Sequence, residues 1–258
     1  AAEPAPLGPV QPPPLDRVQP RAPAPPQAQR ARPTKVPKWV VRYVEKNRRA
    51  LAGLGCAATR TYGCGSNGCA FPCRDRRWTV KVTADPSEVG MSQFVIGLRR
   101  RGVSVPGIVK FHGVYRGKDL VVGPRAWVIV REAVDPVPRE TPSSSPVSRA
   151  ISLLARASAA AADRNEAAEA GDPRGVSTAT RRFREHLTRA SRLPVAAPIA
   201  KTMWRLATKE GLYLEDVRRD NVGLVDRPDG RRLVVMDPGG QLTYPRFSHF
   251  PRMVQEEF

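Results

Sequence analysis

GLYLEDVRRDNVGLVDRPDGRRLVVMDPGG, residues 211–240, is the stretch around which the rest of the chain is arranged. Two short β-prone runs in it are joined by the turn at 226–230, and this pattern predicts a hairpin. Asp216 and Asn221 precede the hairpin, and Asp237 follows it. A hairpin would bring these two carboxylates and the amide oxygen to one edge, and such hard-oxygen ligands suit Mg²⁺ and the phosphates that it carries. The stretch therefore predicts a site for phosphoryl transfer.

A glycine-rich pattern, GxGxxG, lies nearer the N-terminus and precedes a β-prone run that contains Lys81. Its candidate phosphate-binding residues are Gly63, Gly65, Ser66, Asn67 and Gly68. Glycines let backbone amides approach phosphates, and a lysine at this distance can reach the α- and β-phosphates of ATP. A Rossmann dinucleotide site needs a helix at the last glycine, whereas residues 70–81 indicate strand, turn and strand. The pattern therefore favours an ATP-binding loop.

The order Asp-x-x-x-x-Asn, strand, turn, strand, Asp-x-Gly resembles the catalytic and metal-binding loops of the protein kinase superfamily. This resemblance implies that Asp216 accepts the proton of the acceptor hydroxyl and that Arg218 neutralises the transferring phosphoryl group. It also implies that Asn221 and Asp237 bind Mg²⁺. Arg218, two residues after Asp216, suits a Ser/Thr acceptor in this family.

The same resemblance assigns roles in the first half of the chain. Residues 85–101 predict a helix with Glu88 near its start, where the family places the glutamate that pairs with the strand lysine, here Lys81. The alternative for Glu88 is an acid that is favoured only by the helix macrodipole. A later β-prone run ends at Glu132, and the hinge from Glu132 to Val134 would receive adenine.

Some residues differ from the family pattern. Leu214 and Glu215 stand where the family usually has His and Arg, and Pro238 stands where it usually has Phe. Eighteen residues follow Gly240, whereas a full protein kinase continues with an activation segment and further helices. The resemblance is therefore to a minimal, atypical kinase with a truncated C-lobe.

These patterns predict an α+β, two-lobed protein-kinase-like fold, with a small antiparallel-sheet N-lobe and a reduced, mainly helical C-lobe. The apolar residues 212–214 predict a short strand fragment before the catalytic loop. The expected parts are a disordered Pro-rich arm (1–37), an N-lobe with a leading helix (38–134), a helical insertion (135–192) and a minimal catalytic C-lobe (193–258).

Charge and cysteine content limit the partners and the compartment. The formal net charge is +19, which favours an acidic partner or activator and does not exclude nucleic acid. The alternative is that the arginines lie on solvated helix faces. No stretch resembles a transmembrane segment, so we expect a cytosolic protein. All four cysteines lie within 56–73 without a zinc-site spacing, and we expect free thiols in a reducing compartment.

The preferred function is an ATP- and Mg²⁺-dependent serine/threonine protein kinase that acts on a protein substrate. Its truncated large lobe, Pro-rich arm and cytosolic composition together resemble those of the compact kinases that pathogenic bacteria inject into host cells. This resemblance implies possible export and makes a host chaperone a candidate substrate. One alternative is a pseudokinase or nucleotide-binding scaffold with basic helices. Another is a small-molecule phosphotransferase of the aminoglycoside-kinase type, although a strongly basic protein is a poor host for cationic antibiotics.

Overall fold

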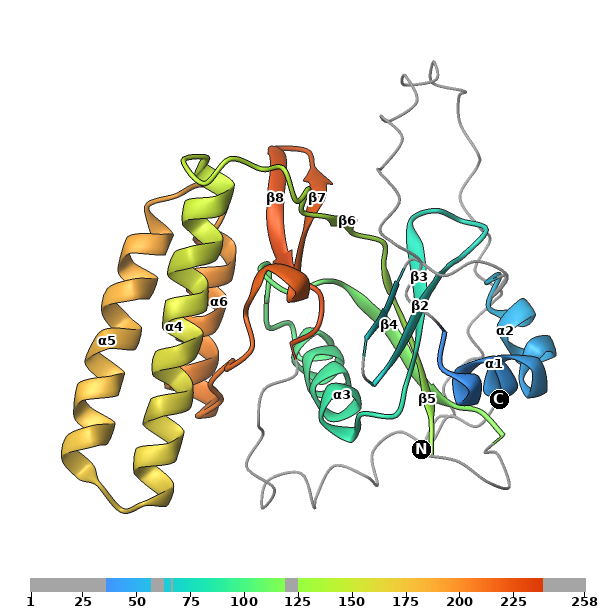
Figure 1. The fold of residues 1–258 in the computed structure, drawn as a ribbon, viewed down its shortest axis with the longest axis horizontal. Coiled ribbons are helices and arrows are strands. Elements are labelled where there is room, and N and C mark those ends of the chain that lie inside the picture. The colour runs from blue at the N-terminus through green and yellow to red at the C-terminus, as the bar shows by residue number, and fades with distance from the viewer. Residues whose placement is uncertain (1–35, 57–62, 66, 119–124, 239–258) are drawn as a thin grey trace, which may run out of the picture. The chain divides into compact units, whose positions relative to one another are not determined.

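The computed structural model describes residues 36–56, 63–65, 67–118 and 125–238 (Figure 1). Its helices are α1 (Lys38–Lys46), α2 (Arg48–Gly53), α3 (Pro86–Arg100), α4 (Pro146–Glu169), α5 (Pro173–Ser191) and α6 (Ala197–Arg205), with a π-helical turn η1 (Leu206–Glu210) and a 3₁₀ turn η2 (Arg219–Asn221). Its strands are β1 (Gly63–Gly65), β2 (Gly68–Pro72), β3 (Trp78–Thr83), β4 (Phe111–Arg116), β5 (Trp127–Glu132), β6 (Asp135–Pro136), β7 (Val222–Arg227) and β8 (Gly230–Val235). Nearly all of the predicted arm, 1–37, lies outside the described residues, as does Ser66.

An antiparallel sheet in the order β1-β2-β3-β5-β4 forms the N-terminal half. Successive side chains of a strand point to opposite faces of the sheet. Val80 and Val128 therefore pack with α1 and α2 in one buried cluster, whereas Ile129 packs with α3 in another. Lys81 is the cross-strand partner of Ile129, so the lysine points to the same side of the sheet as Ile129, which packs with α3.

Helix α3 begins and ends where the sequence predicts. The Asp85 carboxylate accepts a hydrogen bond from the Ser87 amide at 2.8 Å, and Pro86 occupies the first turn, which together form a favourable N-terminus. Gly102, with a φ of 75°, follows the helix; a left-handed residue at this place stops a helix, and glycine adopts it without steric cost. Helix α3 packs against β4 and β5.

The C-terminal half combines helices with a second sheet in the order β6-β7-β8. Helices α4 and α5 form an antiparallel pair, and α6 packs against α5 and β8 (Figure 1). Gly211, with a φ of 66°, follows η1. The chain then runs through 212–217 without regular secondary structure, so the predicted strand fragment at 212–214 is wrong. Leu214 is buried there although its backbone belongs to no sheet.

The described residues therefore have the predicted α+β fold, with an antiparallel sheet first and a mainly helical part after it. The segment 135–192 contains one short strand besides helices α4 and α5. It opens with β6, in which Asp135 pairs with Leu224 of the hairpin. Helix α5 begins at Pro173, because Asp172 caps it and Pro173 occupies its first turn.

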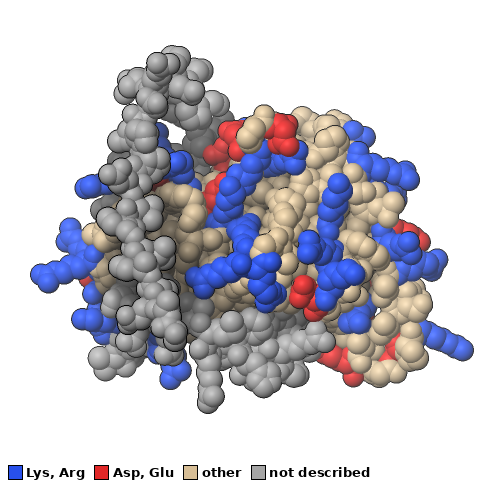
Figure 2. Space-filling view, turned by 180° about the vertical axis from the view of Figure 1, so that it is seen from behind, with Lys and Arg blue, Asp and Glu red and all other residues tan. Residues whose placement is uncertain are grey.

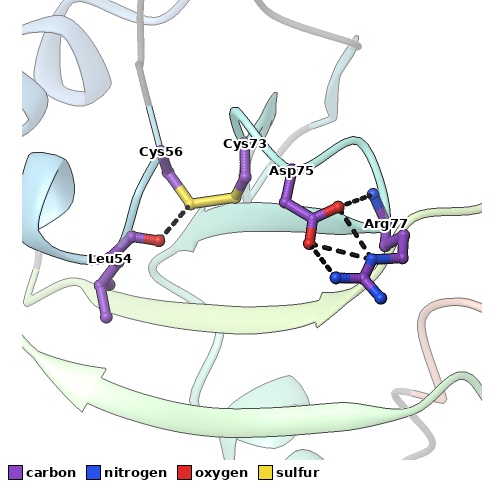
Figure 3. Close-up of a disulfide and its surroundings, with 5 residues drawn as sticks. All are labelled: Leu54, Cys56, Cys73, Asp75 and Arg77. Atoms are coloured by element: carbon purple, nitrogen blue, oxygen red, sulfur yellow. Dashed lines mark hydrogen bonds and ion pairs between the residues drawn. A yellow bond between two sulfur atoms is a disulfide. The ribbon is translucent and has the colours of Figure 1, made fainter. Parts of the chain in front are cut away.

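The expectation of free cysteine thiols is wrong. Cys56 forms a disulfide with Cys73 (Figure 3), and Cys64 forms one with Cys69. Cys64 and Cys69 are directly opposite each other on β1 and β2, and this register brings the two sulfur atoms together. Because disulfides persist in oxidising compartments, the pairing also counts against the expected reducing environment.

Candidate active site

Lys81, Glu88 and Asp237 come together at the junction of the sheet, α3 and the end of β8. Lys81 Nζ lies 2.7 Å from Glu88 Oε1 and 2.8 Å from Asp237 Oδ2. The hydroxyl of Thr83 donates to Glu88 Oε2 at 2.9 Å, so both carboxylate oxygens of Glu88 have partners. Glu88 is a buried residue on α3. The structure thus forms the lysine–glutamate pair and joins it to an acid 156 residues further along the chain.

A fourth charged side chain, Arg131 of β5, belongs to the same cluster. Its Nη1 lies 2.6 Å from Asp237 Oδ1 and donates to the carbonyl of Met236 at 2.5 Å. Arg131 pairs in register with Thr79 and lies two residues beyond Ile129, so it points to the same face of the sheet as Lys81. Sequence reasoning missed Arg131. The available signal was a charged residue directly after four apolar residues of a β-prone run.

Burial and mutual charge shift the two acids of this cluster in opposite directions. Burial raises the pKa of Glu88 to about 7, the negative charge of Asp237 adds to this increase, and Lys81 only partly opposes it. Burial alone would also raise the pKa of Asp237. The positive charges of Arg131 and Lys81 outweigh it there, so the pKa of Asp237 lies below its usual value. Asp237 is therefore the fixed negative charge of the cluster.

Asp216 lies at the other end of the candidate site and is partly exposed. Asn221 Nδ2 donates to Asp216 Oδ2 at 2.6 Å and to the Asp216 carbonyl at 2.9 Å. Arg218 Nε lies 3.1 Å from Asp216 Oδ1. The carbonyl of Asn221 accepts a hydrogen bond from the Met236 amide at 2.8 Å. Asn221 therefore connects the Asp216 loop to the residue before Asp237.

Helix α4 supports this loop through side chains that sequence reasoning missed. The Ser158 hydroxyl donates to the Leu214 carbonyl at 2.7 Å and accepts from the Val217 amide at 2.9 Å. Asn165 donates to the carboxylate of Glu215. Burial raises the pKa of Glu215, and the hydrogen bond from Asn165 opposes this shift. Leu214 and Glu215 are thus both held by side chains of α4.

The glycine loop contains glycines of two kinds. A Cβ at Gly68 would lie 2.0 Å from the Val82 carbonyl oxygen, so Gly68 allows β2 and β3 to pair. A Cβ at Gly63 or Gly65 would have no described atom within 4 Å, so packing requires neither glycine. The carbonyl of Asn67 accepts from the Ala84 amide at 2.8 Å, which ties the loop to the end of β3.

In the predicted hinge, several hydrogen-bonding groups already have partners within the protein. The amides of Glu132 and Ala133 donate to the carbonyls of Lys110 and Arg77, both at 2.7 Å. The Glu132 carboxylate pairs with Arg227 on β7. Val134 lies against Gly223, where any larger residue would collide with its side chain. Of the two named hinge residues, therefore, Glu132 serves structure through its amide and carboxylate, and Val134 lies beside the C-terminal hairpin.

No family model matches this chain, and no curated protein sequence matches it either. Among solved structures, the crystal structure of the Mycobacterium tuberculosis PknI kinase domain matches 72% of this chain, with 16% identity and a TM-score of 0.32. A double mutant of the same domain matches 74% of this chain, with 18% identity and a TM-score of 0.32. This chain spans 60% and 64% of the lengths of those two chains. At these TM-scores the likeness assigns no activity, substrate or partner to this chain.

The candidate metal ligands have suitable chemistry but an unsuitable arrangement. Carboxylate and amide oxygens suit Mg²⁺, yet each oxygen of Asp237 already faces a cation, Arg131 or Lys81. The amide nitrogen of Asn221 points to Asp216. Within the described ranges, no group of three or more His, Cys, Asp or Glu side chains could hold a metal ion. The residues as they are placed do not fit a divalent cation at Asp237.

Proposed function

We propose that this chain is an ATP-dependent phosphotransferase of the protein-kinase-like type. The observation that carries the proposal is the position of Lys81 Nζ, within 2.8 Å of both Glu88 and Asp237. A half-buried lysine between two carboxylates is held in one orientation, and it can bind phosphate oxygens as a point charge. A side chain at Gly63 or Gly65 would meet no described atom within 4 Å, and we propose that this space admits the phosphates.

The reaction proposed at the other end of the site is transfer of the γ-phosphoryl group to a hydroxyl. The hydroxyl oxygen would bond to the γ-phosphorus while the bond from that phosphorus to the bridging oxygen breaks, and ADP would leave. Asp216, whose side chain is 43% exposed, would take the hydroxyl proton. Arg218 beside it would offset the negative charge of the transferring group. No step in this scheme passes through a metal ion.

The acceptor is proposed to be a Ser or Thr hydroxyl in a protein with acidic segments. Figure 2 shows many Lys and Arg side chains and few Asp and Glu side chains on one face of the molecule, and the chain carries a net charge of +19. Such a surface attracts acidic partners and repels cationic small molecules. In the part of the chain that the structure describes, no helix is long and apolar enough to cross a membrane.

The test compares Asp216→Asn with Asp220→Asn, which changes an exposed acid in the same loop. Each purified full chain is incubated with γ-labelled ATP and a cell lysate as the source of acceptors, with Mg²⁺ and separately with EDTA. We expect Asp216→Asn to lose transfer by about 10²–10⁴-fold, as for a missing general base, and Asp220→Asn to keep it. Equal labelling by wild type and Asp216→Asn would refute the role of Asp216.

A nucleotide-binding scaffold is the second candidate, and the ion pair between Arg131 and Asp237 favours it. The melting temperature in the presence of ATP reports nucleotide binding, since any ligand that binds the folded state raises it, and the transfer assay then separates the two candidates. Stabilisation by ATP without transfer in any condition would select the scaffold. Neither stabilisation nor transfer would reject the nucleotide site.

A further inference from the structure

Arg131 places a positive charge against the acid that kinase-like enzymes use for a metal ion. Its guanidinium lies 2.6 Å from Asp237 Oδ1, and its side chain is only 8% exposed. The second oxygen of Asp237 lies 2.8 Å from Lys81 Nζ. Both oxygens are therefore engaged by residues of neighbouring strands, β3 and β5.

The surroundings of Arg131 hold it in this position. Strand β5 lies between β3 and β4, so its backbone is paired on both sides. The same Nη1 that contacts Asp237 also donates to the Met236 carbonyl, which adds a second anchor on the C-terminal hairpin. Moving Arg131 away would require a buried guanidinium to give up both contacts, and it would leave the partly buried Asp237 with Lys81 alone.

Charge balance decides what else the cluster can bind. Arg131 and Lys81 together match the charges of Glu88 and Asp237. A divalent cation on Asp237 would stand within a few ångströms of the guanidinium, and like charges repel strongly where the effective dielectric is low. An anionic phosphate would instead meet two fixed cations, one of which has the planar donor geometry that binds phosphate well.

We propose that Arg131 takes the place of a metal ion at Asp237, so that this chain binds nucleotide phosphates without a divalent cation at that position. The inference rests on the proposed function, because the ligand is the nucleotide assigned there. In this scheme Arg131 holds Asp237, excludes metal from it, and supplies one of the two cations that meet the phosphates.

The first experiment needs no nucleotide. Binding of Mn²⁺, which replaces Mg²⁺ as an EPR-visible probe, is titrated for the full-length wild type, Arg131→Met and Arg131→Lys. We expect no specific Mn²⁺ site in the wild type or in Arg131→Lys, which keeps the charge. Arg131→Met should gain one Mn²⁺ site that binds at least about tenfold more tightly than any Mn²⁺ binding by the wild type. The double variant Arg131→Met/Asp237→Asn should lose this site.

Arg99→Met is the matched control, because Arg99 is another partly buried arginine that donates to a carbonyl, that of Ile108. It should stay as free of Mn²⁺ as the wild type. A wild-type Mn²⁺ site that Asp237→Asn removes would overturn the proposal even if Arg131→Met failed to fold. A folded Arg131→Met that gains no Mn²⁺ would overturn it as well.

The second experiment measures the ATP-induced rise in melting temperature in EDTA and in Mg²⁺. The wild type should give the same rise in both, whereas Arg131→Met should give it only in Mg²⁺. If ATP raises the melting temperature of the wild-type protein only when Mg²⁺ is present, metal-independent binding is refuted. If ATP stabilises neither protein in either condition, the proposed function fails, and the Mn²⁺ titration alone then decides whether Arg131 excludes metal.

Discussion

At the scale of single residues, the cluster around Lys81 couples the protonation of Glu88 to the charge of Asp237. The pKa of Glu88 is raised to about 7 by burial and by Asp237, so Glu88 takes up a proton just below neutral pH. The cluster then carries two cations and one carboxylate, Asp237. A site with a net positive charge attracts phosphate more strongly than a site with no net charge. Protonation of Glu88 would therefore favour nucleotide binding.

The stability of the protein should therefore depend on Glu88 between about pH 4.5 and pH 7. Its raised pKa means that the folded state binds more protons than the unfolded state in this window, so the free energy of unfolding falls as the pH rises through it. Relative to Glu88→Gln, the wild type should lose on the order of 1–3 kcal/mol from pH 5 to pH 7.5. The lowered pKa of Asp237 acts with the opposite sign, and only below its ordinary value of 3.8.

Urea unfolding of both proteins at several pH values measures this difference. Glu185→Gln, on the exposed face of α5, is the control and should follow the wild-type pH dependence. Parallel pH profiles for the wild type and Glu88→Gln would show that Glu88 is ionised throughout the range.

At the scale of elements, α4 positions the loop that carries Asp216. Ser158 is buried on α4 and bonds to both Leu214 and Val217, so one hydroxyl satisfies a carbonyl and an amide on the same side of the loop. Asp216 lies between these two anchored residues in the chain. The loop is thus held by a helix that precedes it by more than fifty residues.

Ser158→Ala should leave that carbonyl and that amide without their partner. An unsatisfied buried polar group costs about 1–3 kcal/mol, so the free energy of unfolding should drop by about that amount. Phosphoryl transfer should fall more than ATP binding, because Asp216 loses its position while Lys81 keeps its own. Ser191→Ala, at an exposed end of α5, should change stability by less than about 0.5 kcal/mol. A Ser158→Ala protein with wild-type transfer would show that α4 does not position the loop.

At the scale of the whole molecule, two disulfides tie the leading helices and the glycine loop to the sheet. Cys56, just after α2, is joined to Cys73 at the end of β2 across 17 residues (Figure 3). The nearby turn between β2 and β3 contains the ion pair of Asp75 and Arg77, at 2.7 Å. The carbonyl of Arg77 in turn binds the amide of Ala133 at the hinge. The disulfide is therefore one of a series of contacts that lead from α2, through the turn between β2 and β3, to the hinge.

Removal of this cross-link should destabilise the fold. Closing a loop of this length contributes about 3 kcal/mol by the chain-entropy model, so Cys56→Ser/Cys73→Ser should lower the free energy of unfolding, measured in urea, by about that amount. Cys64→Ser/Cys69→Ser is the comparison and should cost about 2 kcal/mol, because its loop is shorter. Native protein should show no thiol that reacts with an alkylating reagent in mass spectrometry. Reactive thiols at all four cysteines would contradict both disulfides.

The sequence by itself determined the local elements and the identity of several polar residues at the site. β-prone runs defined β3 and β5, the Asp85-Pro86 cap and Gly102 defined α3, and the turn at 226–230 defined the hairpin. These features depend on residues close together in the chain, so local propensity and periodicity carry the information. The order of Lys81, Glu88 and Asp237 was also visible, and their ion pairs follow once the sheet and hairpin meet.

Only the tertiary structure decided which distant side chains share a partner. Arg131 reaches Asp237 across 106 residues, and it does so because the register of β5 places it on the same face as Lys81. Four cysteines allow three pairings, and the register of β1 and β2 selected between them. Ser158 likewise had no local signal. The physical reason is the same in each case: packing fixes which buried polar groups must satisfy one another, and neighbours in sequence do not.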